Sequence, residues 1–155
     1  MLGNGTTFKI YLPHATGEIS RPTANAKEER EFKGCETILI VEDEESVRAL
    51  AGRILREQGY TVLEARDGAE ALHIAREFAG DIQLVLTDVV MPGMSGKTMV
   101  SRLETTRPNI KALYISGYTD SAIVHHGLLD SSIAFLQKPF TIESLMRKVR
   151  EVIRS

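Results

Sequence analysis

The stretch IQLVLTDVVMPGMSG, residues 82–96, joins a strand of buried type to a single acid and a turn. Its first part, Ile82–Thr87, is largely apolar, which is typical of a strand covered on both faces of a sheet. Asp88 ends the strand, and Met91–Gly93 predicts a turn. A carboxylate in this position is either a solvated strand terminus or a group presented for chemistry, and the rest of the chain helps to decide between them.

Similar strands recur along the chain and alternate with helical patterns. We predict strands over Thr37–Val41, Thr61–Ala65, Ile82–Thr87, Lys111–Ser116 and Ala134–Gln137. Helical patterns lie over Glu45–Gln58, Ala71–Ala79, Gly96–Thr106, Asp120–Leu129 and Ile142–Ile153. This alternation predicts an α/β fold, a doubly wound parallel sheet with helices on both faces and right-handed crossovers. In such sheets ligands bind outside the carboxyl ends of the strands.

Apolar spacing in two of the helical patterns predicts the faces that pack on the sheet. The first helix carries Val47, Leu50, Ala51, Ile54 and Leu55 on one face. The last helix carries Ile142, Leu145, Met146, Val149, Val152 and Ile153 on one face. Because helical residues three and four apart share a face, we expect both sets to be buried.

Composition excludes several classes of protein. A length of 155 residues suits one domain with an appendage, and a net charge of −2 gives no basic field for nucleic acid. No apolar run approaches the roughly 20 residues of a membrane span, and the N-terminus lacks a signal peptide. The single Cys35 suits a reducing compartment. We therefore expect a cytoplasmic protein without nucleic-acid or membrane contacts.

The first 36 residues differ from the rest. Thr7–Leu12 alternates like a strand and Pro13 ends it, whereas residues 14–36 are mostly polar and read as a linker. A lone strand is not stable by itself, so residues 1–13 look like the end of another domain or like a strand that pairs with a partner. We divide the chain into residues 1–13, a linker at 14–36 and a main domain at 37–155.

Polar groups follow four of the five predicted strands. Glu42-Asp43 ends the first, Asp88 the third, Ser116 the fourth and Lys138 the fifth. The three carboxylates and one ammonium sum to −2, and crowded carboxylates need neutralising. Mg²⁺ with oxygen ligands would do this. The alternative for Asp43 is a helix N-cap, but the convergence of a third acid favours a metal.

The chemistry that fits this cluster is phosphoryl transfer. A carboxylate such as Asp88 can act as a nucleophile and form an acyl phosphate. The remaining needs are a metal that bridges oxygens and cations for the spreading charge, for which Lys138 is suited. The Ser116 hydroxyl can donate a hydrogen bond to a phosphoryl oxygen.

Residues 37–155 resemble a response-regulator receiver domain. The motifs that carry the resemblance are the acids of ILIVEDEE, the Asp of LTDVVMPGMSG, the hydroxyl of ISG and the Lys-Pro of FLQKPF. The resemblance implies a flavodoxin-like sheet of strand order 2-1-3-4-5, as in a receiver protein that illustrates this fold. It also implies a role in a two-component system or phosphorelay.

The resemblance also assigns roles to residues. It implies that Asp88 accepts a phosphoryl group from a phosphohistidine of a histidine kinase or phosphotransfer domain. Mg²⁺ would be bound by Asp43, Asp88 and the backbone carbonyl of Val90, with Glu42 acting through water. Ser116 and Phe135 would be switch residues that change the surface formed by the helix Asp120–Leu129, the strand Ala134–Gln137 and the last helix. Whether two copies pair through this surface stays open.

Two positions beside the site suggest a slow loss of the phosphoryl group. Val90 is apolar and Tyr118 is bulky, so neither is suited to orienting an attacking water. We expect slow self-dephosphorylation, tuned by both residues. Glu42 stands where the family more often has Asp, which is a conservative difference.

The tail has a resemblance of its own. LGNGTTFKIYLP is similar to the closing strand of a histidine-kinase ATP-binding domain. It implies that this chain is the C-terminal receiver of a hybrid sensor histidine kinase, and it leaves open whether the parent protein is attached to a membrane. Because the rest of the ATP-binding domain is missing, we expect no kinase activity here, and only self-catalysed phosphoryl transfer and dephosphorylation.

Other classes fit less well. A haloacid-dehalogenase phosphatase needs a second acid two residues after the nucleophile, where this chain has Val90. A non-phosphorylated pseudo-receiver, acting as an interaction module, would lack Asp88, Asp43 or Lys138, and all are present. A metal site at His125-His126 is disfavoured because adjacent helical side chains diverge by about 100°.

Overall fold

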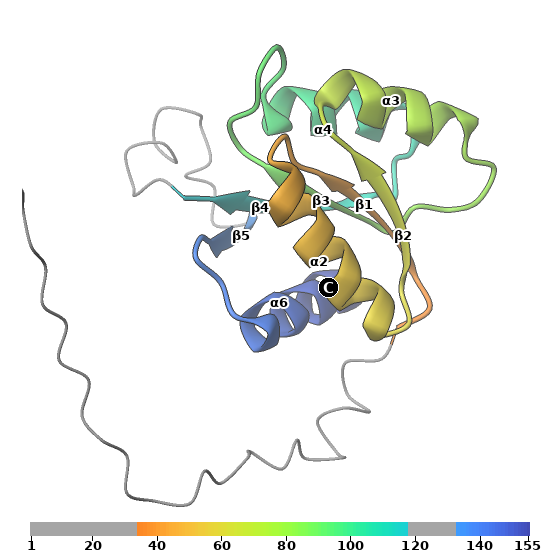
Figure 1. Ribbon diagram of the computed structural model, residues 1–155. Coiled ribbons are helices and arrows are strands. Elements are labelled where there is room, and N and C mark those ends of the chain that lie inside the picture. Colours follow the sequence, from red (N-terminus) through yellow and green to blue (C-terminus); the bar gives the residue numbers. More distant parts are fainter. Residues whose placement is uncertain (1–33, 118–132) are drawn as a thin grey trace, which may run out of the picture.

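Short apolar segments form one parallel sheet. In the computed structural model, which describes residues 34–117 and 133–155, the strands lie in the order β2-β1-β3-β4-β5. They are β1 (Thr37–Val41), β2 (Thr61–Ala65), β3 (Leu84–Asp88), β4 (Lys111–Ser116) and β5 (Ala134–Gln137). The described helices are α2 (Glu45–Glu57), α3 (Gly68–Glu77), α4 (Gly96–Thr106) and α6 (Ile142–Arg154). The predicted fold class and strand order are confirmed (Figure 1).

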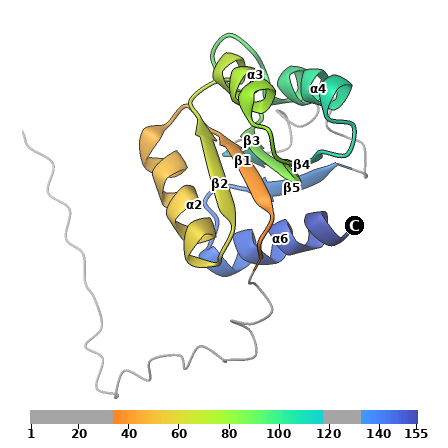
Figure 2. The same cartoon turned by 90° about the vertical axis from the view of Figure 1, so that its right-hand side faces the viewer.

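The helices cover both faces of the sheet. Helices α2 and α6 lie on one face, and α3 and α4 lie on the other (Figure 2). Ile38 and Ile40 of β1 join the core on the α2 and α6 side, whereas Leu39 and Val41 join the core on the α3 and α4 side. Successive residues of a strand point to opposite faces, so burial on both sides requires an uninterrupted apolar run.

Side chains at the helix starts show which polar residues are used for capping. Asp67 accepts a hydrogen bond from Glu70 N–H, Ser95 from Thr98 N–H, and Thr141 from Ser144 N–H. The N-cap of α2 is Glu44, and its side chain makes no capping hydrogen bond. The alternative that Asp43 caps this helix is therefore wrong, and its carboxylate is available for another role.

Most predicted boundaries agree with the structure, and three need correction. The third strand covers Leu84–Asp88 rather than Ile82–Thr87, and the side chain of Gln83 accepts a hydrogen bond of 2.7 Å from the N–H of Thr37. Helix α2 ends at Glu57, because Gly59 adopts a φ of 94° that most residues avoid. Helix α3 ends at Glu77, so Phe78 and Ala79 lie outside it.

Two residues predicted to be buried are exposed. Leu50 is 48% exposed and Ile142 is 59% exposed. The buried residues of α2 are Ala51, Gly52, Ile54 and Leu55. The packed stripe is thus rotated toward Gly52 and away from Leu50, which the spacing of apolar residues did not reveal.

Some predictions fall outside the described residues. They concern the strand Thr7–Leu12, the helix Asp120–Leu129, Tyr118 and the His125-His126 pair.

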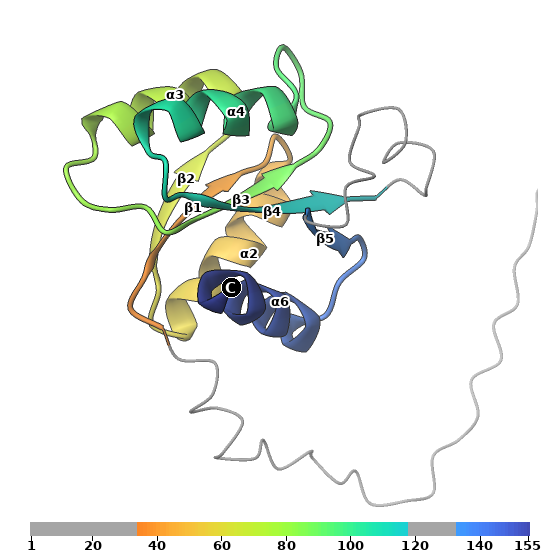
Figure 3. The same ribbon diagram turned by 180° about the vertical axis from the view of Figure 1, so that it is seen from behind.

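Seen from behind, β4 and β5 lie between α4 above and α6 below (Figure 3). Among the described helices, none has the length and apolarity needed to cross a membrane.

Candidate functional site

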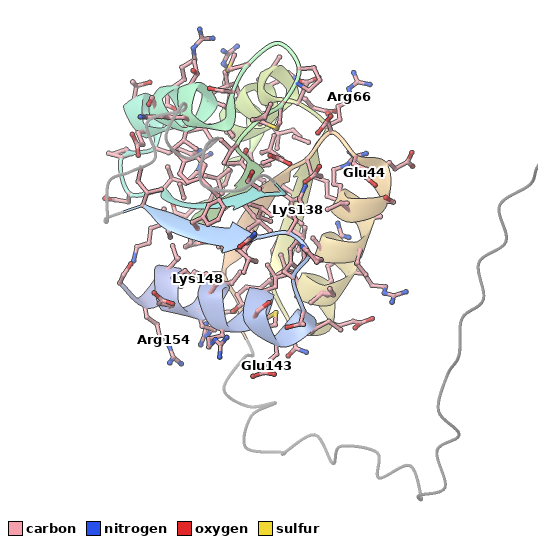
Figure 4. All side chains as sticks on the ribbon, turned by 90° about the vertical axis from the view of Figure 1, so that its left-hand side faces the viewer. Glu44, Arg66, Lys138, Glu143, Lys148 and Arg154 are labelled. Carbon is pink, nitrogen blue, oxygen red and sulfur yellow. The ribbon has the colours of Figure 1, made fainter. Side chains whose placement is uncertain are left out.

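The polar strand ends meet at one edge of the sheet, which we name the carboxyl edge. Glu42 and Asp43 follow β1, Asp88 ends β3, and Lys138 follows β5. In Figure 4, Lys138 lies just beyond the arrow of β5, on the edge that also carries Glu44 and Arg66. All strands are parallel, so their carboxyl ends collect here from distant parts of the sequence.

Lys138 is shared between two of the carboxylates. Its Nζ lies 2.7 Å from Glu42 Oε2 and 2.8 Å from Asp88 Oδ2. Carboxylate oxygens of Glu42, Asp43 and Asp88 lie within 4.8 Å of one another. The structure thus brings together the four residues that the strand ends predicted to converge.

Backbone groups orient the carboxylates. The N–H of Val90 donates to Asp88 Oδ1 at 3.1 Å, and the N–H of Glu44 lies 3.3 Å from Glu42 Oε1. The hydroxyl of Thr87 donates to the carbonyl of Asp88 at 3.0 Å. Asp88 is therefore held on both its side chain and its main chain, as a reactive group needs to be.

Gly96 is required by a close approach of two main-chain segments. It is the first residue of α4, and its N–H donates to the carbonyl of Val89 at 3.0 Å. A Cβ at this position would collide with the carbonyl oxygen of Asp88. The glycine lets α4 begin directly beside Asp88, which closes the Val89–Ser95 loop against the site.

The cluster is unevenly buried and incompletely neutralised. Glu42 is only 4% exposed, whereas Asp43 is exposed and Asp88 is intermediate. Burial raises the pKa of Glu42, and this outweighs the lowering effect of Lys138. Burial alone would lower the pKa of Lys138, but its hydrogen bonds and charge interactions with Asp88 and Glu42 raise it above its ordinary value. One ammonium does not fully compensate three carboxylates.

The donor set fits a hard divalent cation. It offers three neighbouring carboxylates, two of which contact one lysine, so the formal charges are −3 and +1. Mg²⁺ binds oxygen ligands and commonly takes one or two protein carboxylates while keeping several waters. Asp43, which is exposed, and Asp88, which is half-buried, can supply these carboxylates. Buried Glu42, already bonded to Lys138, is less available as a direct ligand.

The remaining predicted residues lie around this cluster. Ser116 is buried, and its carbonyl accepts a hydrogen bond of 2.8 Å from the N–H of Lys138. Phe135 of β5 is half-buried and packs against the core on the α3 and α4 side of the sheet. Val90 is 43% exposed beside Asp88. Tyr118 belongs to the residues that the structure does not describe.

Sequence reasoning missed two residues that support the site. Thr87 is fully buried, and a hydroxyl inside an apolar strand was the signal for it. Arg48 of α2 donates from Nη1 to the carbonyl oxygen of Glu42 at 2.6 Å. Arg48 had no such signal, because its contact depends on how α2 folds back beside β1.

Comparison with known proteins gives a consistent result. Residues 38–150 match the family model of the response regulator receiver domain. The sensor kinase CckA of Brucella abortus is 41% identical over 159 aligned residues, which cover 98% of this chain and 17% of that protein. The chain spans half or less of the length of the first curated relatives that it matches.

Solved structures agree with the family match. The receiver domain of the hybrid histidine kinase CckA is 41% identical with a TM-score of 0.64, over 76% of this chain and 98% of that one. The Vibrio cholerae chemotaxis protein CheY4 is 27% identical with a TM-score of 0.68, over 77% of this chain and 99% of that one.

Proposed function

The chain belongs to the response regulator receiver domain family of two-component systems, and we propose that Asp88 is its phosphoacceptor. The donor is a phosphohistidine of a histidine kinase or of a phosphotransfer domain. The observation that carries this proposal is the bridging of Asp88 and Glu42 by Lys138, with the Asp43 carboxylate beside them. Asp88 then serves as the acceptor, Lys138 as the cation and Asp43 as a metal-binding acid, all at one edge of the sheet.

The transfer uses few protein groups. A carboxylate oxygen of Asp88 attacks the phosphorus, the new P–O bond forms, and the P–N bond to the imidazole breaks. The electron pair of that bond stays on the imidazole nitrogen, which is left neutral or takes a proton. Lys138 moves from the carboxylate oxygen to a phosphoryl oxygen, and the Val90 N–H keeps Asp88 in the attacking orientation.

The proposed ligands of Mg²⁺ are Asp43, Asp88 and the carbonyl of Val90, and Glu42 would act through water. When bound, Mg²⁺ neutralises phosphoryl oxygens and aligns them with the acceptor. The burial of Glu42 and its bond to Lys138 support this division, because they leave Asp43 as the accessible carboxylate.

The signal passes from the site through β4 and β5. Ser116 follows the phosphoryl group, and Phe135 turns into the space that Ser116 leaves, which changes the surface of β5 and α6. Pairing of Ser116 with Gln137 and of Tyr114 with Phe135 supports this route, because the two strands share a continuous register. Homodimerisation through this surface is one outcome that the switch would control.

The phosphoryl group is long-lived in this proposal. Val90 is 43% exposed beside Asp88 and offers no side-chain hydrogen bond to a water, and Tyr118 adds bulk. Val90→Asn should shorten the lifetime of the phosphorylated form, because an amide can orient water. Loss of the phosphoryl group from the native chain within seconds would contradict slow self-dephosphorylation.

The chain is, we propose, the receiver of a hybrid histidine kinase, preceded by a linker at residues 14–36 and by a remnant strand of the ATP-binding domain at residues 1–13. The alignment with sensor kinase CckA over 98% of this chain supports this, because it includes most of the residues before Thr37. In this proposal the receiver works in the cytoplasm.

The test is incubation with acetyl phosphate, with and without Mg²⁺, of the native chain, Asp88→Asn and Asp81→Asn. Asp81 is an exposed acid on the opposite edge of the sheet and serves as the matched control. We expect Mg²⁺-dependent phosphorylation of the native chain and the control, and none of Asp88→Asn. A native chain that stays unphosphorylated would instead support the interaction-module alternative.

A further inference from the structure

Helix α2 contains a glycine where a helix former is expected. Gly52 is buried in the helix interior, where glycine costs about 1 kcal/mol relative to alanine. A Cβ here would lie 2.7 Å from Glu64 Oε1 and 3.0 Å from Arg56 Nη1. The missing side chain therefore makes room for the carboxylate of Glu64, which reaches across from β2.

Glu64 holds two arginines of α2, and one of them reaches the candidate site. Arg56 Nη2 lies 2.6 Å from Glu64 Oε1, and Arg48 Nε lies 3.9 Å from Glu64 Oε2. Arg48 Nη1 donates to the carbonyl oxygen of Glu42 at 2.6 Å. The arginine that contacts the site is well covered, with its side chain only 17% exposed.

The hydrogen bond from Arg48 takes the place of a strand partner for the carbonyl of Glu42. The pairing of β1 with both neighbours ends at Val41, so the Glu42 carbonyl lies beyond the ladder. The N–H of Glu42 still donates to the carbonyl of Ala65 at 3.1 Å, and Arg48 satisfies the carbonyl. The peptide group that joins Glu42 to Asp43 is thus fixed at its oxygen.

We propose that Arg48 is a positioning residue for the metal-binding acids, and that Glu64 orients Arg48. By holding the Glu42–Asp43 peptide, Arg48 keeps Glu42 directed to Lys138 while Asp43 faces Asp88. The inference rests on the proposed function, because it takes Mg²⁺ as the ligand of these acids. Groups that orient metal ligands typically alter metal affinity by about 10- to 100-fold when they are removed.

Helix α2 also provides a matched control. Arg53 forms an ion pair with Glu57 at 3.6 Å, and the two side chains are 74% and 66% exposed. This pair has the same charges on the same helix, but the described structure gives Arg53 no contact with β1. Removing Arg53 therefore tests the effect of charge without the effect on position.

The experiment measures Mg²⁺ affinity by calorimetry, together with the Mg²⁺-free melting temperature. The variants are Arg48→Met, Arg48→Lys, Glu64→Gln and Arg53→Met. We expect Arg48→Met to weaken Mg²⁺ binding about tenfold or more, and Glu64→Gln to weaken it less. Arg48→Lys should recover part of the affinity, because lysine can donate to the carbonyl, and Arg53→Met should bind Mg²⁺ as the native chain does.

The outcomes separate this inference from the proposed function. Native Mg²⁺ affinity in a folded Arg48→Met variant would overturn the positioning role, while Asp43→Asn would still weaken binding strongly if the proposed function holds. If Arg48→Met does not fold, unchanged affinity in both Arg48→Lys and Glu64→Gln overturns the inference. Absence of Mg²⁺ binding by the native chain would instead refute the proposed metal site itself.

Discussion

The two edges of the sheet use their charged groups differently. At the carboxyl edge, three carboxylates lie close together, and the ammonium of Lys138 pairs with two of them, Glu42 and Asp88. At the opposite edge, which we name the amino edge, cations bind specific partners. Arg107 donates to the carbonyls of Ala75, Phe78 and Gly80, and Lys111 donates to the carbonyl of Ile153.

This difference separates stability from chemistry. Carbonyls at the amino edge are left by the ends of α3 and α6, and the cations satisfy them, so these bonds stabilise the fold. The carboxyl edge keeps an excess of negative charge beside a buried Glu42, which a fold under selection for stability alone would avoid. Substitutions at the two edges should therefore change different measurements.

The largest expected effect is on metal affinity at the carboxyl edge. Asp43→Asn should weaken Mg²⁺ binding by on the order of a hundredfold, because it removes the accessible carboxylate of the cluster. The Mg²⁺-free stability should change little, since Asp43 is exposed. Titration and scanning calorimetry measure the Mg²⁺ affinity and the Mg²⁺-free stability of this variant and of Asp81→Asn, which changes an exposed acid at the amino edge. Equal Mg²⁺ affinity in the two variants would remove the distinction between the edges.

The corresponding change at the amino edge should affect stability alone. Arg107→Met should lower the free energy of unfolding by about 2–3 kcal/mol, because carbonyls at the end of α3 lose their donors. Urea unfolding measures this, with Arg102→Met as the control, because Arg102 is an exposed residue of α4, the helix that Arg107 follows as C-cap. Mg²⁺ affinity should stay native, and a loss of affinity would show that the edges are coupled.

A smaller effect should appear in the pH dependence of Mg²⁺-free stability. Because burial raises the pKa of Glu42 above its ordinary 4.5, the folded chain holds this proton at a pH where the unfolded chain has released it. The native chain should therefore lose stability relative to Glu42→Gln as the pH rises from below 4.5 toward neutral. A difference that is constant with pH, or that grows in favour of the native chain, would contradict the raised pKa of Glu42.

The smallest expected effect is at the Glu36–Arg150 ion pair of the amino edge, where Nη1 and Oε1 lie 3.1 Å apart. One carboxylate pairs with one guanidinium, and both side chains are partly exposed. Glu36→Gln should therefore lower the free energy of unfolding by about 1 kcal/mol or less. Thermal unfolding measures it. Phosphorylation by acetyl phosphate should be unchanged, and a slower reaction would argue against a purely structural role for this edge.

Much of the fold could be predicted because it depends on local patterns. Continuous apolar runs located all five strands, and parallel order placed Glu42, Asp43, Asp88 and Lys138 at one edge. The site could be predicted for the same reason: strand ends that are distant in sequence must meet in a parallel sheet.

What escaped prediction depends on contacts between elements. The buried stripe of α2 includes Gly52, beside which the carboxylate of Glu64 from β2 lies, and it excludes Leu50. Arg48 reaches Glu42 only through this packing. Residue spacing within one element does not contain this information.

The most direct measurement of the central claim is the position of the phosphoryl group. The native chain is incubated with acetyl phosphate and Mg²⁺, the acyl phosphate is reduced with borohydride, and the modified residue is located by peptide mass spectrometry. We predict reduction at Asp88 alone, and only when Mg²⁺ is present during phosphorylation. Modification of Asp43 or Glu42 in place of Asp88, or equal labelling without Mg²⁺, would contradict the account.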